Sequence, residues 1–170
     1  MALVVRPQPH DLELLFIRRA VSPGDPWSGH MALPGGRRAP SDADGRATAQ
    51  RETLEEVGID LATSGEYLGR LDDLQPRSGA PAIVVSPYVF AVAPAASTRP
   101  NHEVEFAVWV ALGELTAPHA AAEHLQALAS GESLRFPAIA HGGQLIWGLT
   151  YRIVIQFLGI VTRGEPEGAQ

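Results

Sequence analysis

The sequence predicts an α/β or α+β sandwich in which helices cover a mixed β-sheet. Strand-like apolar segments recur along the chain, a few helical segments lie between them, and 45% of the 170 residues are hydrophobic, which is enough for one sizeable core. No internal repeat or low-complexity linker divides the chain. We therefore expect a single domain over residues 1–162, followed by a frayed tail over residues 163–170.

The first half of the chain predicts two strands, a long loop and a helix. ALVV (2–5) and LELLFIRRA (12–20) read as strands because the turn-rich RPQPHD separates them. The Gly- and Pro-rich residues 21–42 form a loop, and a loop of this length in a compact domain is more often functional than idle. Residues 42–58 are predicted to be helical.

Several signals support this helix. Ser41 or Asp42 is the expected N-cap, with acidic residues in the first turn, and Gly58 is the expected stop. The apolar residues expected along its body are Ala47, Leu54 and Val57.

The second half continues with strands and two helices. The expected elements are strand-like segments at 67–74, 82–94 and 104–112, a helix at 117–130, a hairpin at 135–147 and an apolar helix at 148–161. The last helix is apolar nearly all round, which indicates burial, so Arg152 within it needs a partner. His119 and His124 lie five residues apart, which on a helix does not suit a metal pair, and we expect both to face solvent.

Composition limits the partners. The net charge is -6, the pI is about 5.4, and all 13 basic residues are arginine, which argues against binding bulk nucleic acid. No apolar run is long enough to span a bilayer, so we expect a cytoplasmic protein without membrane contact, either monomer or homodimer. Cysteine is absent, so any metal must be held by oxygen or imidazole, which favours Mg²⁺ or Mn²⁺.

The stretch RETLEEVG, residues 51–58, gathers unusual negative charge. On a helix, Glu52, Glu55 and Glu56 fall within an arc of roughly 100°. Like charges this close repel unless something neutralises them, and carboxylates are the ligands that Mg²⁺ and Mn²⁺ prefer. Arg51 is placed to pair with Glu55 and hold its rotamer.

The alternative is an ordinary solvated helix face, because glutamate is a good helix former. The upstream LPGG favours a site instead. Gly35 and Gly36 let the backbone approach a bound ion or phosphate closely, because neither carries a Cβ. Arg37 and Arg38 directly follow and are candidate phosphate contacts, with an equal case for ordinary surface charges.

Residues Gly35 to Ile59 resemble the signature box of the Nudix hydrolases. The matching positions are Gly36, Arg51, Glu52, Glu55, Glu56, Gly58 and Ile59. The sequence departs from that pattern in two ways. Asp42 stands where the family has Glu, with one extra residue before Arg51, and Thr53 occupies a position that is usually aliphatic.

The resemblance implies an α/β/α sandwich around a mixed sheet and hydrolysis of a nucleoside diphosphate linked to another moiety. It implies that Glu52 and Glu56 bind Mg²⁺ or Mn²⁺, that Glu55 ligates the ion or positions the attacking water, and that the Gly36 carbonyl completes the shell. Arg51 would orient these side chains. The family often takes a further base from a later loop, where Glu103 and Glu105 are candidates and Glu103 is favoured, although both could be ordinary surface charges.

Flanking segments are similar to the branch that includes coenzyme A diphosphatases. Gly29 and Leu33-Pro34-Gly35-Gly36 fit the motif of that branch, with Leu in place of an aromatic residue and Asp25 where an Arg is usual. The branch implies coenzyme A or a derivative as substrate, cut to 3′,5′-ADP and 4′-phosphopantetheine. Two alternatives stay open: a Nudix pyrophosphatase for nucleotide sugars, dinucleoside polyphosphates or nucleoside triphosphates, and a non-catalytic module that senses a nucleotide.

Overall fold

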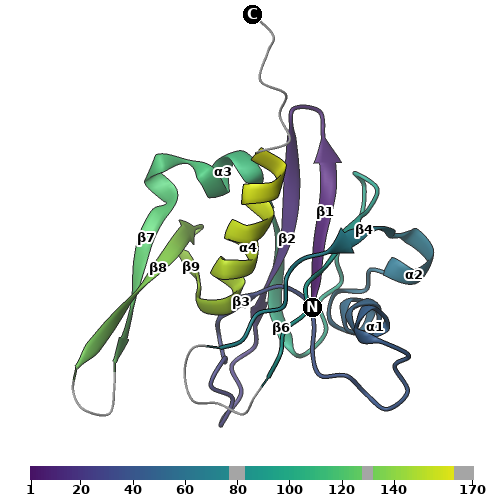
Figure 1. Cartoon of the computed structure of the whole chain (residues 1–170), viewed down its shortest axis with the longest axis horizontal. Coiled ribbons are helices and arrows are strands. Elements are labelled where there is room, and N and C mark those ends of the chain that lie inside the picture. Colours follow the sequence, from purple (N-terminus) through teal and green to yellow (C-terminus); the bar gives the residue numbers. More distant parts are fainter. Residues whose placement is uncertain (77–82, 128–131, 163–170) are drawn as a thin grey trace, which may run out of the picture.

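The computed structural model of the chain describes residues 1–76, 83–127 and 132–162 (Figure 1). The strands are β1 (Ala2–Gln8), β2 (Asp11–Arg19), β3 (Met31–Ala32), β4 (Glu66–Arg70), β5 (Tyr88–Ala91), β6 (Val104–Ala111), β7 (Ala121–Ala127), β8 (Ser133–His141) and β9 (Gln144–Trp147). The helices are α1 (Gly45–Val57), α2 (Leu61–Ser64), α3 (Leu112–Thr116), the 3₁₀ turn η1 (Pro118–Ala120) and α4 (Gly148–Val161). The tail expected over residues 163–170 lies outside the described part.

A six-stranded mixed sheet forms the centre of the structure. Its order is β3-β2-β1-β5-β4, and β6 also pairs with β2. Strands β1 and β5 are parallel, whereas the other pairs in this sheet are antiparallel. The chain leaves β3 beside the start of β1, where the Ala2 N–H donates to the Pro34 carbonyl at 2.8 Å. This contact fixes the Gly-rich turn at the edge of the sheet.

The two faces of the central sheet are covered by different helices. Because successive strand residues point to opposite faces, β1 and β2 each supply side chains to both layers. One layer packs Leu3, Val5, Leu14 and Phe16 against Ile153, Val154, Phe157 and Leu158 of α4. The other packs Ala2, Val4, Leu15 and Ile17 against Ala49, Val57, Ile59 and Leu61 at α1 and α2. The expected α/β/α sandwich around a mixed sheet is therefore confirmed.

Helix α1 begins later than the sequence predicts. Its N-cap is Asp44, whose Oδ1 accepts a hydrogen bond from the Ala47 N–H at 2.7 Å, and its first turn carries no acidic residue. The expected cap Asp42 is instead a buried side chain outside the helix. The expected stop is confirmed, because Gly58 adopts φ 72° and its N–H donates to the Leu54 carbonyl at 3.0 Å.

The orientation of α1 differs from the expected apolar stripe. Leu54 is 47% exposed, whereas the Glu56 residue is only 2% exposed. The buried residues of this helix are Thr48, Ala49, Thr53, Glu56 and Val57. The face turned toward the sheet therefore carries a carboxylate, which an ordinary packing face would not.

The prediction of a helix over residues 117–130 is wrong for residues 117–127, which are the part of this range that the structure describes. Only η1 is helical there, and β7 follows it directly. β7 pairs with β8 in an antiparallel ladder, and β9 completes a separate three-stranded sheet. Alanine-rich segments favour helix locally, but seven consecutive cross-strand pairs override this preference. In Figure 1 this sheet stands to one side of α4.

Two further predictions concern β5 and α4. The expected strand over residues 82–94 is much shorter, with β5 running from Tyr88 to Ala91, and residue 82 is not described. The hairpin over 135–147 and the apolar helix over 148–161 are confirmed as β8–β9 and α4. Arg152 finds its partner in the Gln75 carbonyl, 2.7 Å from its Nη1. Among the described residues, none of the helices has the length and apolar character needed to cross a membrane.

Candidate active site

The Gly-rich turn that follows β3 lies against the second half of α1. The Gly35 N–H donates to Glu56 Oε2 at 2.8 Å. A Cβ placed on Gly36 would lie 2.5 Å from Cδ of Glu52 and 2.7 Å from its Oε2. Glycine at position 36 therefore allows the Glu52 carboxylate to lie directly against the backbone of the turn.

Glu56 is the most strongly perturbed carboxylate of this site. Burial raises its pKa from 4.5 to about 7, and the neighbouring charge of Glu52 adds to the effect. The hydrogen bond from Gly35 and the positive charge of Arg19 act in the opposite direction, and the charge of Glu103 raises the pKa further. A buried carboxyl group that titrates near neutrality is typical of functional sites.

Arg51 joins the helix to the loop that precedes it. Its Nε and Nη2 donate to the two oxygens of Asp42 at 3.0 and 3.1 Å, a bidentate pair. The same guanidinium donates to Glu52 Oε1 and to Glu55 Oε2, both at 2.8 Å. Pairing with Arg51 holds the pKa of Asp42 far below its usual range. Arg51 therefore fixes the positions of two of the three glutamates, as expected for Glu55.

Asp42 holds Arg51 in place from the loop before α1, a role that the sequence did not predict. Besides Arg51, its Oδ2 accepts hydrogen bonds from the Ala39 N–H at 2.8 Å and from Thr48 Oγ1 at 3.0 Å. The shorter acidic side chain and the extra residue before Arg51 still produce the ion pair.

The third glutamate of the acidic stretch points elsewhere. The Glu55 side chain is 53% exposed and binds Arg51. Over residues 1–76, 83–127 and 132–162, no three His, Cys, Asp or Glu side chains are grouped as a metal site of three such ligands would require. The site therefore consists of Glu52 and Glu56 against the Gly-rich turn, with Glu55 at its rim.

The loop before β6 brings one further carboxylate to the site. The N–H groups of Arg99 and Asn101 donate to the carbonyls of Val57 and Glu56 at 2.7 and 2.9 Å, which ties this loop to the end of α1. Glu103 follows, and its charge acts on Glu56. Glu105 lies differently, because its carboxylate pairs with Arg18. Of the two candidates from the sequence, Glu103 is thus the one whose charge acts on the acidic site.

The two arginines after the glycines have different surroundings. Arg38 donates from Nη2 to the carbonyls of Asp42 and Ala43 at 3.1 and 2.7 Å, so its guanidinium is engaged with the loop backbone. Arg37 is exposed, and its carbonyl accepts from Arg51 at 3.2 Å. A phosphate contact remains a prediction for both arginines, and it suits Arg37 better because the Arg38 guanidinium already donates to two loop carbonyls.

The rings of His30, His124 and Trp147 form a cluster that the sequence did not predict. His124 stacks on Trp147 with ring centroids 3.7 Å apart, and His30 meets the same indole edge-on at 5.0 Å. His119 is exposed as expected, whereas His124 is only partly exposed, because β7 places one side of its ring against Trp147. No spacing in the sequence indicates the contact, since it depends on the pairing of β7 with β8.

The donor set suits a hard divalent cation. Magnesium is commonly held by one or two carboxylates, with waters and substrate phosphates completing its shell. Glu52 and Glu56 supply two carboxylates that raise each other's energy when both are ionised, and a cation would relieve this repulsion. The absence of a Cβ at Gly36 keeps the approach from the turn open. The residues present therefore fit such an ion.

Comparisons with known proteins agree with this arrangement. The NUDIX domain model matches residues 1–130. An uncharacterized protein of Schizosaccharomyces pombe is 42% identical over 110 residues, covering 62% of this chain, and the match spans only 33% of that protein.

Solved structures share the fold at low sequence identity. The Nudix hydrolase RenU from M. smegmatis is similar at a TM-score of 0.61 and 20% identity, covering 99% of this chain and 87% of that chain. The C. elegans Ap4A hydrolase in a binary complex is similar at a TM-score of 0.56 and 19% identity, covering 66% and 78%. At these identities the similarity concerns the fold alone.

The sandwich and the acidic helix define an α/β/α domain with two carboxylates, Glu52 and Glu56, against a Gly-rich turn. More particularly, the chain belongs to the Nudix family, because the family model covers most of its length.

Proposed function

We propose that this chain hydrolyses the diphosphate linkage of a nucleoside diphosphate derivative with the help of Mg²⁺ or Mn²⁺, and that coenzyme A or a derivative is the substrate. The observation that carries the proposal is the buried Glu56, held by the Gly35 N–H beside Glu52. Such a carboxylate pair is costly to bury without a partner, and it is well suited to a site where positive charge binds together with a phosphate.

The roles follow from the contacts. Glu52, Glu56 and the Gly36 carbonyl would hold the cation, and Glu55 would be the further ligand or would position water. A bound cation would supply positive charge to offset the charge that develops on the phosphoanhydride. Arg51 keeps Glu52 and Glu55 in fixed orientations through its hydrogen bonds. Glu103 lies close enough to influence Glu56 and is the proposed acceptor of the proton from the attacking water.

Coenzyme A is favoured by the motif that precedes α1. Gly29 has φ 73° and lies close to Arg18, as expected of a required turn glycine. The Leu33-Pro34-Gly35-Gly36 stretch leads directly into the acidic site. Dinucleoside polyphosphates, nucleotide sugars and nucleoside triphosphates offer the same linkage and are the alternative substrates.

A panel of substrates tests the proposal. Coenzyme A, ADP-ribose and a dinucleoside tetraphosphate are incubated in parallel with the protein and Mg²⁺ or Mn²⁺, and the products are identified by mass. Release of 3′,5′-ADP and 4′-phosphopantetheine with the highest kcat/KM supports coenzyme A. A higher kcat/KM for another member replaces coenzyme A by that substrate. Binding without turnover of any member would instead indicate the nucleotide-sensing module.

The glycine turn provides a first prediction. Gly36→Ala is expected to lower kcat/KM by more than about 10-fold while the fold is kept, because the new methyl group displaces the flexible Glu52 carboxylate rather than backbone. Gly35→Ala is the contrasting variant, since its Cβ would lie 2.6 Å from the Met1 Cα and its φ is 150°. Thermal melting should show loss of stability for Gly35→Ala only. Full activity in Gly36→Ala would contradict the placement of Glu52.

The loop before β6 provides a second prediction. Glu103→Gln is expected to lower kcat by about 10²- to 10⁴-fold, the usual contribution of a general base, with a smaller change in KM. Glu105→Gln is the matched control, because Glu105 pairs with Arg18 and should leave kcat within about twofold. Equal effects of the two variants would remove the assignment of Glu103.

A further inference from the structure

Arg19 ends strand β2 at an irregularity beside the acidic site. In the ladder between β2 and β6, Arg18 faces Phe106 whereas Arg19 faces Val104, so Glu105 is the extra residue of a β-bulge. Bulges bend the strand and redirect neighbouring side chains, and they are frequent next to active sites. Arg18 pairs with the bulged Glu105 and donates to the Gly29 carbonyl. Arg19 therefore points away from this surface pair.

The Arg19 guanidinium pairs with a loop carboxylate, and the next residue, Ala20, donates from its N–H to the Glu103 carbonyl at 2.8 Å. Arg19 Nη2 donates to Asp25 Oδ2 at 2.7 Å. Its positive charge acts on Glu56, whose pKa it lowers. Arg19 therefore lies within electrostatic reach of the residues proposed to meet the diphosphate.

Arg19 has hydrogen-bonding capacity that the described residues do not use. Its Nε is buried and has no hydrogen-bond partner among them, one of two side-chain polar atoms in that position. A buried donor without a partner costs free energy, and such a group in a native structure calls for an explanation, of which a role at a functional site is one. A guanidinium offers two parallel N–H groups, which match two oxygens of a phosphate.

We propose that Arg19 is a substrate-binding residue that holds the phosphate farther from the acidic pair, and that the phosphate replaces Asp25 as its partner. The Asp25 carboxylate accepts from Nη2 at one edge of the guanidinium, as a phosphate oxygen would. Asp25 also accepts a hydrogen bond from the Trp27 N–H at 3.0 Å. It therefore keeps one partner when the phosphate replaces it on Arg19. The assignment rests on the proposed function, because it presupposes a diphosphate at Glu52 and Glu56.

The structural alternative is that Arg19 and Asp25 only fasten the loop between β2 and β3. The two roles predict different results. If the pair is only a fastener, Arg19→Gln and Asp25→Asn remove the same contact and have similar effects. If Arg19 binds phosphate, Arg19→Gln weakens binding, whereas Asp25→Asn removes a competitor and leaves binding equal or tighter. Asparagine keeps an acceptor for the Trp27 N–H, so the loop retains that contact.

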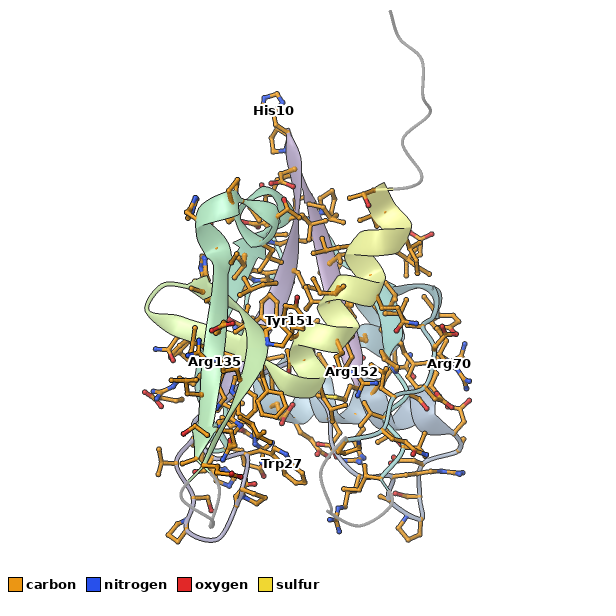
Figure 2. All side chains as sticks on the ribbon, turned by 60° about the vertical axis from the view of Figure 1, so that its left-hand side comes forward. His10, Trp27, Arg70, Arg135, Tyr151 and Arg152 are labelled. Atoms are coloured by element: carbon orange, nitrogen blue, oxygen red, sulfur yellow. The ribbon has the colours of Figure 1, made fainter. Side chains whose placement is uncertain are left out.

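Calorimetric titration with inorganic pyrophosphate in the presence of Mg²⁺ tests the assignment. Arg19→Gln is expected to weaken binding by about 10- to 100-fold, the usual effect of losing a hydrogen bond to a charged group. Arg19→Lys should be intermediate, because it keeps the charge but not the paired N–H groups. Arg6→Gln is the matched control, since Arg6 pairs with Glu13 at 2.6 Å and both are largely buried. Figure 2 shows His10 in the hairpin near this pair and Trp27 in the loop after Arg19 at opposite ends of the molecule.

Kinetics with the best substrate of the panel separates the outcomes. Arg19→Gln should raise KM more than it lowers kcat, whereas Arg6→Gln should change neither by more than about twofold. Pyrophosphate binding that is weakened equally by Arg19→Gln and Asp25→Asn, or unchanged in Arg19→Gln and Arg19→Lys, overturns the assignment. So does a wild-type protein that does not bind pyrophosphate. Arg19-dependent binding without turnover of any substrate would overturn the proposed reaction and leave the phosphate contact standing.

Discussion

Glu56→Gln is expected to lower kcat/KM by more than about 100-fold without disturbing the fold. Outer partners of a metal site already account for about 10- to 100-fold in activity, so a residue proposed to bind the ion directly should exceed this. Glutamine keeps an oxygen that accepts from the Gly35 N–H, and it occupies nearly the same volume. The variant therefore removes the negative charge and little else.

The measurement compares steady-state kinetics at several concentrations of Mg²⁺ or Mn²⁺. The control is Glu123→Gln, because Glu123 is exposed and pairs with Arg135 on the separate sheet. Unchanged turnover in Glu56→Gln would remove the proposed ion site. Recovery of activity at high Mn²⁺ would instead indicate that the carboxylate acts through affinity for the cation.

The same variant is expected to be more stable than the wild type at alkaline pH in the absence of divalent cations. Burial raises the pKa of Glu56 from 4.5 to about 7, so the folded protein holds a proton that the unfolded chain releases. The loss of folding stability caused by ionising the buried Glu56 is absent below pH 4.5. It grows as the pH rises from 4.5 to about 7, and above that pH it stays constant. It amounts to on the order of 3 kcal/mol at full development, because each pKa unit corresponds to about 1.4 kcal/mol.

Chemical denaturation of the wild type and of Glu56→Gln, at about pH 5 and about pH 8 with a chelator, measures this difference. Comparing the two proteins isolates Glu56 from the other groups that titrate, including the neighbouring Glu52 and Glu103 and the opposing Arg19. The advantage of the variant should appear on raising the pH and shrink when Mg²⁺ is added. A difference that does not depend on pH would show that Glu56 is not buried as an acid of raised pKa.

Much of the fold follows from local patterns in the sequence. The alternation in LELLFIRRA places Leu14 and Phe16 on one face and Leu15 and Ile17 on the other, as two covered faces require. Gly58 ends α1 because glycine readily adopts the positive φ of the helix cap, and this signal depends only on the residue itself and the helix before it. These signals are carried by residues close together in the chain.

The errors arise where tertiary contacts decide. β7 was expected to be helical because alanine dominates its surroundings, but its partner β8 makes it a strand. Of the apolar residues expected along the body of α1, Val57 is buried but Leu54 is exposed, because the helix turns the buried Glu56 toward the Gly-rich turn. A pattern based on burying apolar residues fails on α1, because its inner face carries the buried carboxylate of Glu56.

The sequence was sufficient to predict most residues of the candidate site, but not the contacts that hold them in place. The sequence indicated Glu52, Glu56 and the glycine turn, and the structure brings these together. The buried Asp42 and the unsatisfied Nε of Arg19 could not be foreseen, because each depends on contacts between a loop and a distant element. Charge alone does not reveal which ionic groups are buried.

The backbone hydrogen bonds from Arg99 and Asn101 to the end of α1 also determine where this fold tolerates changes in chain length. The connection between Val92 and Thr98 is held to β1 by the Arg6 Nη1 bond to the Ala96 carbonyl, and among the described residues it makes no hydrogen bond to α1, so we expect a change of length there to displace the carboxylates less. From Arg99 to the start of β6 the backbone is bound to the end of α1, so an inserted residue there should move Glu103 away from α1. Among homologues, gaps in this connection should therefore cluster on its N-terminal side.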